Sequence, residues 1–456
     1  MHENYDLEQL LELAAQKKFR QLKEILSEMN EVDIATFMDE VEPEQLIVIF
    51  RLLPKELAAD VFTYLEDSED QEKLIGALSD KELRSILDEL YLDDAVDIIE
   101  DMPANVVARI LRNTDADTRA QINELLKYPS DSAGSIMTTE YVYLTPDSTV
   151  EEAFARIRRE GLDKETVYTC YVTRRRQLEG VVTVRRMLLS SYDTRIGDIM
   201  ETNLLSVRTH DDREEVAQMF SRYDLTALPV VDNENRLVGI ITVDDAMDVI
   251  EEETTEDFEK MAAILPSDKP YLKTGVIETF RSRIPWLMML MLSATFTGII
   301  LTKFESALAA CVVLTSFIPM LTGTGGNSGS QSSVAVIRAM SLDEIELGDV
   351  FAVVWKECRV AVLCGVCLAI ANFVKMMLVD RWLMHNPEVT PAVALTVCLA
   401  LVGTVLCAKV VGCVLPMAAE KLGIDPAVMA SPFITTVVDA LSLIIYFAIA
   451  TQLLAL

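Results

Sequence analysis

Asp439 is the only charged residue in the C-terminal segment 432–456. This apolar segment is long enough to cross a bilayer as an α-helix. A carboxylate at that depth costs about 2.5–3.5 kcal/mol on insertion scales, so it normally faces a partner, water or an ion. Thr435 precedes Asp439 by four residues and shares its helix face. Together the two side chains are suited to a hydrated cation, although Thr435 alone equally fits a hydroxyl that packs against another helix.

A glycine-rich motif, Pro-Met-Leu-Thr-Gly-Thr-Gly-Gly-Asn-Ser-Gly-Ser-Gln, spans residues 319–331. It has no Gly-Lys-Ser/Thr ending, so it is not a Walker phosphate loop. Non-helical backbone at membrane depth is tolerated where it is buried or lines a wet cavity. The motif therefore predicts a break in a membrane helix, with Asn327 on the cavity wall. A tight-packing turn is the alternative.

A second motif runs from Asp425 to Asp439 and contains Ser431-Pro432 and two threonines. Its oxygen-bearing side chains surround the start of the last apolar segment. With Asn327, they complete a candidate set of pore ligands for a metal ion: Asp439, Thr435, Thr436, Ser431, Asn327 and Asp425.

Charge divides the chain into two halves. Residues 1–283 have 61 acidic and 32 basic residues, whereas residues 285–456 have 11 and 8. An acidic surface excludes nucleic acid as a partner, because phosphate contacts need lysine and arginine. It suits metal cations, or serves only to keep the protein soluble. The first 20 residues are polar and contain no signal peptide, so we expect the N-terminal half to be cytoplasmic.

Five apolar segments predict membrane-spanning helices at about 284–302, 307–322, 350–374, 391–414 and 432–455. Arg281 and Arg283 precede the first segment and favour an inside N-terminus. Seven of the eight cysteines lie in this half, and Cys364-x-x-Cys367 has a redox or metal spacing. Its small apolar neighbours favour helix packing instead.

Leucines at helical spacing over residues 5–130 predict an all-helical region. Pro43, Pro54 and Pro103 begin similar units, because proline fits the first turn of a helix. We therefore expect a helical superhelix domain over residues 1–132.

Residues 137–252 contain an internal repeat. Met137 and Met200 open similar segments, and Gly180-Val-Val-Thr-Val matches Gly239-Ile-Ile-Thr-Val. Each copy is typical of strand, helix, strand, strand, helix. The repeat resembles a tandem pair of cystathionine-β-synthase-type (CBS) domains, over 133–196 and 197–252. In nucleotide-binding relatives a Thr-x-x-Asp ending holds ribose and phosphate. Thr242 and Asp245 are therefore candidate ATP-binding residues. The first copy lacks the acid.

An acidic helical linker follows from Asp244 to about Pro266, with the linker (plug) helix region at 253–280 and the transmembrane domain at 281–456. In this domain order, with the two C-terminal motifs, the whole chain resembles the MgtE family of magnesium channels. The resemblance implies a multidomain fold: an all-α superhelical domain, an α/β CBS pair, a plug helix and five all-α transmembrane helices. It also implies a homodimer in the cell membrane of a bacterium, embedded in lipid, that transports Mg²⁺. Asp439 then faces a pore on the dimer axis, and Ser431 replaces the asparagine of many members.

The resemblance also gives the acidic clusters of the soluble half a role. It implies cytosolic regulatory Mg²⁺ sites between the helical domain, the second CBS copy and the linker, whereas any single acid is equally explained as solvated surface. The matching positions are Asp60, Asp93, Asp97, Asp212, Glu214, Asp224, Asp245, Asp248, Glu253, Glu256 and Asp257.

Two other functions remain open at this stage. One is an ion-coupled divalent-cation transporter, and the other is a membrane-anchored CBS protein that senses nucleotides. An enzyme is disfavoured, because the sequence shows no nucleophile–base pair and no hydrolytic metal-ligand cluster.

Overall fold

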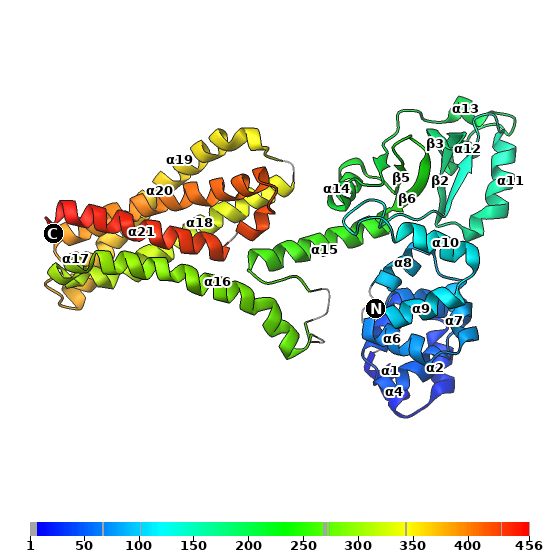
Figure 1. The fold of residues 1–456 in the computed structure, drawn as a ribbon, viewed down its shortest axis with the longest axis horizontal. Helices are drawn as coiled ribbons and strands as arrows, with labels where there is room; N and C mark the ends of the chain where they lie inside the picture. Colours follow the sequence, from blue (N-terminus) through cyan, green and yellow to red (C-terminus); the bar gives the residue numbers. More distant parts are fainter. Residues whose placement is uncertain are drawn as a thin grey trace. The chain divides into compact units, whose positions relative to one another are not determined.

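The computed structural model describes residues 7–65, 68–100, 102–267, 271–272, 274–342, 344–429 and 431–455. The side chains of Pro43, Asp163 and Ser431 lie outside this description. The chain divides into two compact units, Met1–Glu253 and Thr254–Leu456, which are described separately below (Figure 1).

Short helices of eight to ten residues build the N-terminal part of the first unit, as predicted. Pro43 is the first residue of α4, and Pro54 and Pro103 are the N-caps of α5 and α9. Ser79 and Glu82 form a capping box at the start of α7, which satisfies two otherwise unpaired backbone N–H groups. The helices are α1 Leu7–Ala15, α2 Phe19–Leu26, α3 Glu31–Asp39, α4 Pro43–Phe50, α5 Lys55–Thr63, α6 Ser68–Ala77, α7 Asp80–Leu87, α8 Leu92–Glu100, α9 Ala104–Asn113 and α10 Ala116–Leu125.

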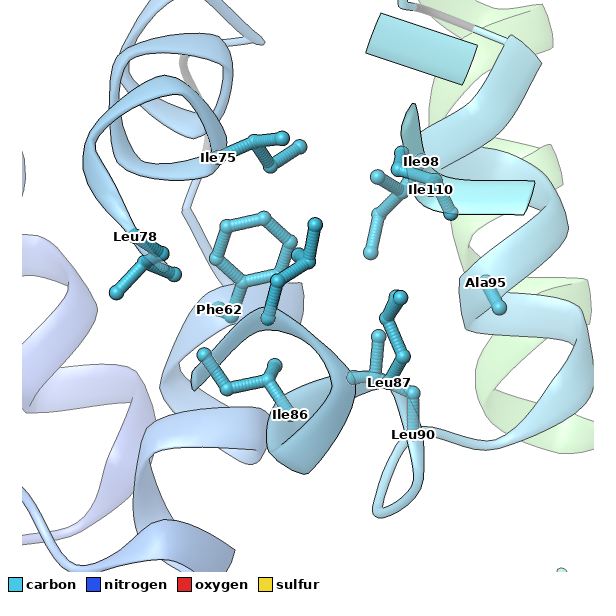
Figure 2. A pocket seen from close by; sticks show the side chains of 10 residues that line it. Phe62, Ile75, Leu78, Ile86, Leu87, Leu90, Ala95, Ile98 and Ile110 are labelled. Carbon is cyan, nitrogen blue, oxygen red and sulfur yellow. The ribbon is translucent and has the colours of Figure 1, made fainter. Parts of the chain in front are cut away.

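Apolar side chains hold these helices together. Figure 2 shows Phe62, Ile75, Ile86 and Ile110 pointing into one small space, although they come from four different helices. Only apolar residues line this space. It is therefore part of the core and offers no polar group to a ligand.

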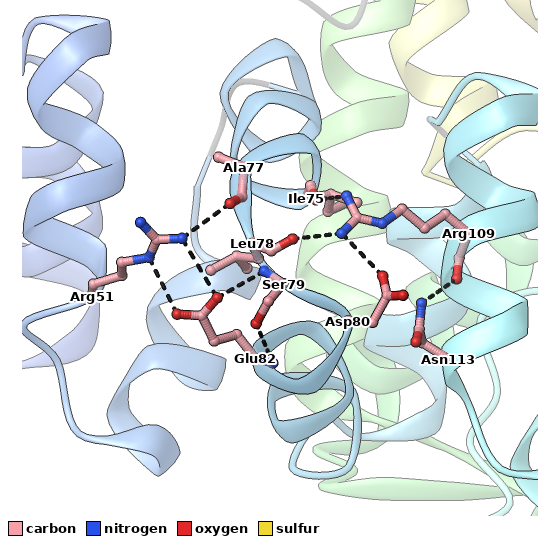
Figure 3. A network of polar contacts seen from close by, with 9 residues as sticks. All are labelled: Arg51, Ile75, Ala77, Leu78, Ser79, Asp80, Glu82, Arg109 and Asn113. Atoms are coloured by element: carbon pink, nitrogen blue, oxygen red, sulfur yellow. Dashed lines mark hydrogen bonds and ion pairs between the residues drawn. The ribbon is translucent and has the colours of Figure 1, made fainter.

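Two arginines tie the C-terminal end of α6 to helices that are not its neighbours in sequence, Arg51 from the end of α4 and Arg109 from α9 (Figure 3). Arg109 donates to the carbonyl oxygens of Ile75 and Leu78, and Arg51 donates to the carbonyl oxygen of Ala77. These carbonyls lie at the C-terminal end of α6, where they have no partner within the helix. Arg51 also pairs with Glu82 at 3.3 Å. The network stabilises the stacking and uses none of the predicted functional acids.

The two repeats have the predicted strand and helix order. The first comprises β1 Tyr141–Leu144, α11 Val150–Glu160, β2 Thr166–Arg174, β3 Gln177–Thr183 and α12 Val184–Leu188, with a 3₁₀ turn, η1, at Gly161–Asp163. A short helix, α13 Ile196–Ile199, leads to the second copy, which comprises β4 Val207–Arg208, α14 Arg213–Tyr223, β5 Ala227–Val231, β6 Leu237–Thr242 and α15 Val243–Met261. In each sheet the first strand is parallel to the second and the third is antiparallel.

The second repeat shares a hydrophobic core with the helical part. Val216 and Phe220 of α14 and Val249 of α15 belong to the same buried cluster as Leu92 and Val96 of α8. This shared core brings α8 and the start of α15 together, and both helices are acidic.

Long apolar helices form the second unit. Of the described residues, four stretches are long and apolar enough to cross a membrane: Val276–Lys303, Leu347–Leu383, Pro391–Lys421 and Pro426–Leu453. The unit contains α16 Val276–Lys303, α17 Glu305–Ala310, η2 Val312–Phe317, α18 Ile318–Ser341, η3 Leu347–Asp349, α19 Val350–Lys375, the π-helix η4 Met376–Leu383, α20 Pro391–Lys421, η5 Pro426–Met429 and α21 Ser431–Leu453.

The predicted boundaries of the second span, 307–322, are wrong. A short α17 and the 3₁₀ segment η2 occupy most of that stretch, and the long helix α18 begins at Ile318. Glycine and serine lower the hydropathy of α18, which is why apolar periodicity placed the span too early. The helix packs closely against α20 and α21 (Figure 1).

Candidate functional site

Six carboxylates gather inside the first unit. Asp93, Asp94 and Asp97 lie on α8, and Asp245 lies on the first turn of α15. Glu140 precedes β1, and Glu165 precedes β2. One oxygen from each of Asp93, Glu140 and Glu165 lies within 4.8 Å of the other two. Carboxylates so close repel one another strongly unless a proton or a cation separates them.

Burial and mutual repulsion perturb this cluster. Burial, followed by the charge of Asp245, raises the pKa of Asp94 to about 7 and the pKa of Asp97 to about 8. Burial, followed by the charge of Asp93, raises the pKa of Glu165 to about 9. The pKa values of Asp93 and Asp245 are also raised, first by burial and then by neighbouring carboxylates. Among the described residues, no lysine or arginine forms an ion pair with any of these five groups.

The donor set fits a hard divalent cation. Asp93 is only 6% exposed, and the buried Oε2 of Glu165 accepts no hydrogen bond from the described residues. Mg²⁺ prefers carboxylate oxygens and keeps several of its waters, which suits a cluster that remains partly open at Asp97. A bound divalent ion would neutralise the repulsion that now raises these pKa values.

Of the predicted regulatory acids, the structure brings together Asp93, Asp97 and Asp245. Asp60 lies near three glutamates of the helical part. Its pKa is raised first by burial and then by the charges of Glu31, Glu56 and Glu89. The charge of Asp60 also acts on Asp94. Asp60 is therefore at the edge of the same acidic region.

Asp212, Glu214 and Asp224 have local structural roles. Asp212 is the N-cap of α14, because its carboxylate accepts from the backbone N–H groups of Glu214 and Glu215. The carboxylate of Glu214 accepts from the Gln218 amide at 3.1 Å. Asp224 ends α14 in a left-handed conformation with φ of 52°.

The acids farther along α15 face different surroundings. The pKa of Asp248 is raised, first by the partial enclosure of its carboxyl group and then by Asp244 and Glu251. Glu253 pairs with Arg213 at 2.9 Å. Glu256 pairs with Lys260 at 2.6 Å, and Asp257 lies half-buried on the next residue of the helix. Glu253 and Glu256 therefore already have cationic partners.

Thr242 and Asp245, the predicted nucleotide pair, contact each other. The Thr242 hydroxyl donates to Asp245 Oδ2 at 2.6 Å. Because Asp245 belongs to the acidic cluster, one side chain connects the end of the second repeat with α8.

Asp439 lies in the middle of α21 and is half-buried. Its buried Oδ1 accepts no hydrogen bond from the described residues. The neighbouring Thr436 hydroxyl donates to the carbonyl oxygen of Pro432 at 3.0 Å, and Thr435 is half-buried one turn before Asp439. The carboxylate is thus held on a packed helix with one buried oxygen that has no hydrogen-bond partner among the described residues.

The glycine-rich motif is helical throughout, so the predicted break in the membrane helix is wrong. Its glycines serve close packing: an added Cβ at Gly325 or Gly326 would lie 2.7 Å from Thr404 or 2.9 Å from Thr435. On α20, a Cβ at Gly412 would lie 2.3 Å from the carbonyl oxygen of Gly329. Small residues let helix backbones approach closely, which explains the composition without a broken helix.

Three predicted pore residues remain: Asn327, Asp425 and Ser431. Asn327 is exposed on α18. Asp425 caps the turn before η5, accepting from the Ala427 N–H at 2.7 Å, and pairs with Lys260 at 2.7 Å. Ser431 begins α21, and its side chain lies outside the described part of the structure.

Two features were missed from the sequence. Glu140 and Glu165 join the acidic cluster from loops of the first repeat, and Lys409, Glu357 and Ser332 form a buried polar group among the long helices. For the buried polar group, the only signal in the sequence was that Glu357 and Lys409, which carry opposite charges, each lie within an apolar segment. No spacing rule connects residues 52 positions apart.

Known proteins align with this chain in the same order of parts. Residues 318–449 match the family described as MgtE, divalent cation transporter, and residues 29–131 match the MgtE intracellular N domain. Residues 133–192 and 196–252 match the CBS domain. The family assignments thus cover the helical part, the repeats and the long helices.

Full-length relatives agree with these matches. The magnesium transporter MgtE of Thermus thermophilus is 38% identical over 439 residues, 95% of each chain. The magnesium transporter MgtE of Bacillus subtilis is 32% identical, over 92% of this chain and 93% of the relative.

Solved structures match the soluble half. The cytosolic domain of the Mg²⁺ channel MgtE in complex with ATP is 40% identical, with a TM-score of 0.50, covering 52% of this chain and 98% of that one. The soluble part of a magnesium transporter is 30% identical, with a TM-score of 0.50, and the match covers 54% of this chain and 97% of that one. From this near-complete similarity, the chain belongs to the MgtE family of magnesium transporters.

Proposed function

We propose that this protein is a Mg²⁺-selective channel that takes up magnesium across the cell membrane of a bacterium and is closed by cytosolic Mg²⁺. The observation that carries the proposal is the acidic cluster formed by Asp93, Asp94, Asp97, Asp245, Glu140 and Glu165. These carboxylates converge from the helical part and from both repeats, and none of the described lysines or arginines pairs with Asp93, Asp97 or Asp245. In this proposal the soluble unit is cytoplasmic, so the cluster meets the internal ion.

The ion path is assigned to α21. A homodimer places two copies of Asp439 about its two-fold axis, where they hold a hydrated Mg²⁺ through few carboxylates and neutral oxygens. The buried Oδ1 of Asp439, which accepts no hydrogen bond from the described residues, supports this assignment. Support for the dimer comes from α16, which has no fully buried residue within one chain and so leaves much of its apolar surface to a second copy or to lipid.

Electrostatic repulsion supplies the gating energy. Two like charges 4 Å apart repel by about 4 kcal/mol at an effective dielectric of 20. Several such pairs exceed the roughly 5.5 kcal/mol that moves a two-state equilibrium from 1:99 to 99:1. When Mg²⁺ bridges the acids, α8 and the start of α15 stay together and the channel is closed. When Mg²⁺ is scarce, repulsion separates them and the channel opens.

We further propose that ATP binds the CBS pair. A relative 40% identical to this chain has a cytosolic domain solved in complex with ATP. Thr242 and Asp245 retain the Thr-x-x-Asp ending, and Asp245 also faces the acidic cluster. ATP that engages Asp245 would therefore alter the affinity of the cluster for Mg²⁺, a coupling that must be reciprocal.

Transport is tested by Mg²⁺ uptake into liposomes that contain the full-length protein, followed with a Mg²⁺-sensitive dye. Asp439→Asn keeps the size of the side chain and removes its charge, and we expect uptake to fall to the rate of empty liposomes. Thr451→Ala, a change on the same helix, is the control and should retain uptake. Uptake that persists in Asp439→Asn would refute the assigned path, and uptake that requires a sodium or proton gradient would identify a coupled transporter instead.

A further inference from the structure

Three polar side chains from three helices meet inside the second unit. Lys409 of α20 is 5% exposed, and its Nζ lies 3.4 Å from Glu357 Oε2 of α19. Ser332 of α18 is 2% exposed. Its hydroxyl donates to Glu357 Oε2 at 2.6 Å and accepts from Lys409 Nζ at 3.0 Å. The three groups form a closed triangle of ammonium, carboxylate and hydroxyl, here called the buried triad.

The energetic cost of these charges implies a specific use. Ionisable residues within membrane helices are expensive and normally mark a functional site. A buried ion pair often contributes no more stability than well-packed apolar residues of similar size. Stability alone therefore gives little reason for Lys409 and Glu357 to be present.

The chemistry of the buried triad resembles a cation site that is already filled. A carboxylate oxygen and a hydroxyl oxygen 2.6 Å apart are the hard ligands that Mg²⁺ prefers. The ammonium group of Lys409 contacts both oxygens and so takes the position of the cation. Asp439 is different, because its Oδ1 accepts no hydrogen bond from the described residues.

We infer that Lys409 is a tethered counter-cation that occupies a carboxylate–hydroxyl site, formed by Glu357 and Ser332, which would otherwise bind a divalent ion. Lys409 thereby withholds Glu357 from the transported ion and leaves Asp439 as the carboxylate that the ion meets. The consequence for transport rests on the proposed function, whereas the binding site itself does not.

The test measures Mg²⁺ binding, not flux. Thermal unfolding of the full-length protein in detergent is followed with and without Mg²⁺ for the wild type, Lys409→Gln, and Lys409→Gln/Glu357→Gln. Mg²⁺ bound at the regulatory cluster stabilises all three proteins equally, so it cancels in the comparison. A new site that binds only the folded protein adds a stability of RT ln(1 + [Mg²⁺]/Kd), which grows with the Mg²⁺ concentration. We expect a larger Mg²⁺-dependent rise in the midpoint temperature for Lys409→Gln, and the wild-type rise for the double variant.

An equal Mg²⁺-dependent rise in all three proteins would overturn the inference. If Lys409→Gln cannot be purified without Mg²⁺, its recovery in Mg²⁺ supports the inference when the double variant is recovered equally with and without Mg²⁺, and its failure to recover contradicts the inference. Lys409→Arg keeps the positive charge and should behave as the wild type. Failure of the proposed channel function would appear separately, as absence of wild-type Mg²⁺ uptake, and would leave this measurement unaffected.

Discussion

Lys260 Nζ lies 2.7 Å from Asp425 Oδ2, so the last turn of α15 is joined to the turn that precedes α21. Lys260 also pairs with Glu256 at 2.6 Å. Burial alone would lower the pKa of Lys260, but the hydrogen bonds that Lys260 donates to Asp425 and Glu256 outweigh burial and raise the pKa. The end of the linker helix is thus held by an ion pair to the turn that leads into the helix carrying Asp439.

Breaking the Lys260–Asp425 pair should weaken channel closure. Because the pair is partly exposed, we expect it to contribute less than about 1 kcal/mol to the closed state. Its loss in Lys260→Gln or Asp425→Asn should therefore raise the half-inhibitory Mg²⁺ concentration about two- to five-fold. Mg²⁺ flux measured against cytoplasmic Mg²⁺ checks this. The double variant should have the same half-inhibitory Mg²⁺ concentration as the single variants. Lys421→Gln, a change at an exposed position, should have that of the wild type. An unchanged or lower half-inhibitory concentration in the single variants would rule out the contact as a closing element.

Without Mg²⁺, the soluble unit should become less stable as the pH rises. The pKa values of Asp94 and Asp97 are raised from 3.8 to about 7 and 8, and that of Glu165 from 4.5 to about 9. The folded state therefore binds more protons than the unfolded state between about pH 4 and pH 9. The stability that these bound protons contribute is fully present below that window and is lost as the pH rises through it.

Thermal unfolding of residues 1–267 by circular dichroism checks this pH dependence. Added Mg²⁺ should flatten it, because bound carboxylates remain ionised in the folded state, and Glu165→Gln should reduce it. A midpoint that rises between about pH 5 and pH 8 in Mg²⁺-free buffer would contradict the predicted sign.

A methyl group at Gly412 should disrupt the second unit. Its Cβ would lie 2.3 Å from the carbonyl oxygen of Gly329, a backbone atom that cannot move aside without shifting α18. We expect Gly412→Ala to destabilise the protein by about 1–3 kcal/mol, as overpacking typically does. The matched control is Gly323→Ala, because nothing lies within 4 Å of the added Cβ. Thermal unfolding in detergent checks both, and equal midpoints would contradict the close crossing of α18 and α20.

Local patterns predicted the soluble half well. Prolines at helix starts placed α4, α5 and α9, and the repeated Gly-x-x-Thr-Val segments placed the third strand and final helix of each copy. The family resemblance also identified Asp93, Asp97 and Asp245, which the structure brings together. Glu140 and Glu165 were missed because tertiary folding, and no sequence spacing, brings these loop residues to α8.

The second unit was harder to predict, because glycine has two uses. Conformational freedom suggested a broken helix at residues 319–331, but the helix is continuous and the missing Cβ atoms permit close crossing. The buried triad was also invisible, since Ser332, Glu357 and Lys409 come from three separate helices. Long-range contacts of this kind leave no periodic signal in the sequence.

The central claim, that internal Mg²⁺ closes the channel through the acidic cluster, is tested most directly by current recordings. Membrane patches containing the full-length protein are excised with the soluble unit facing the bath, and bath Mg²⁺ is varied. The account predicts that the wild-type current falls as bath Mg²⁺ rises, whereas Asp97→Asn/Asp245→Asn stays open at concentrations that close the wild type. Closure of both proteins at the same Mg²⁺ concentration would contradict it.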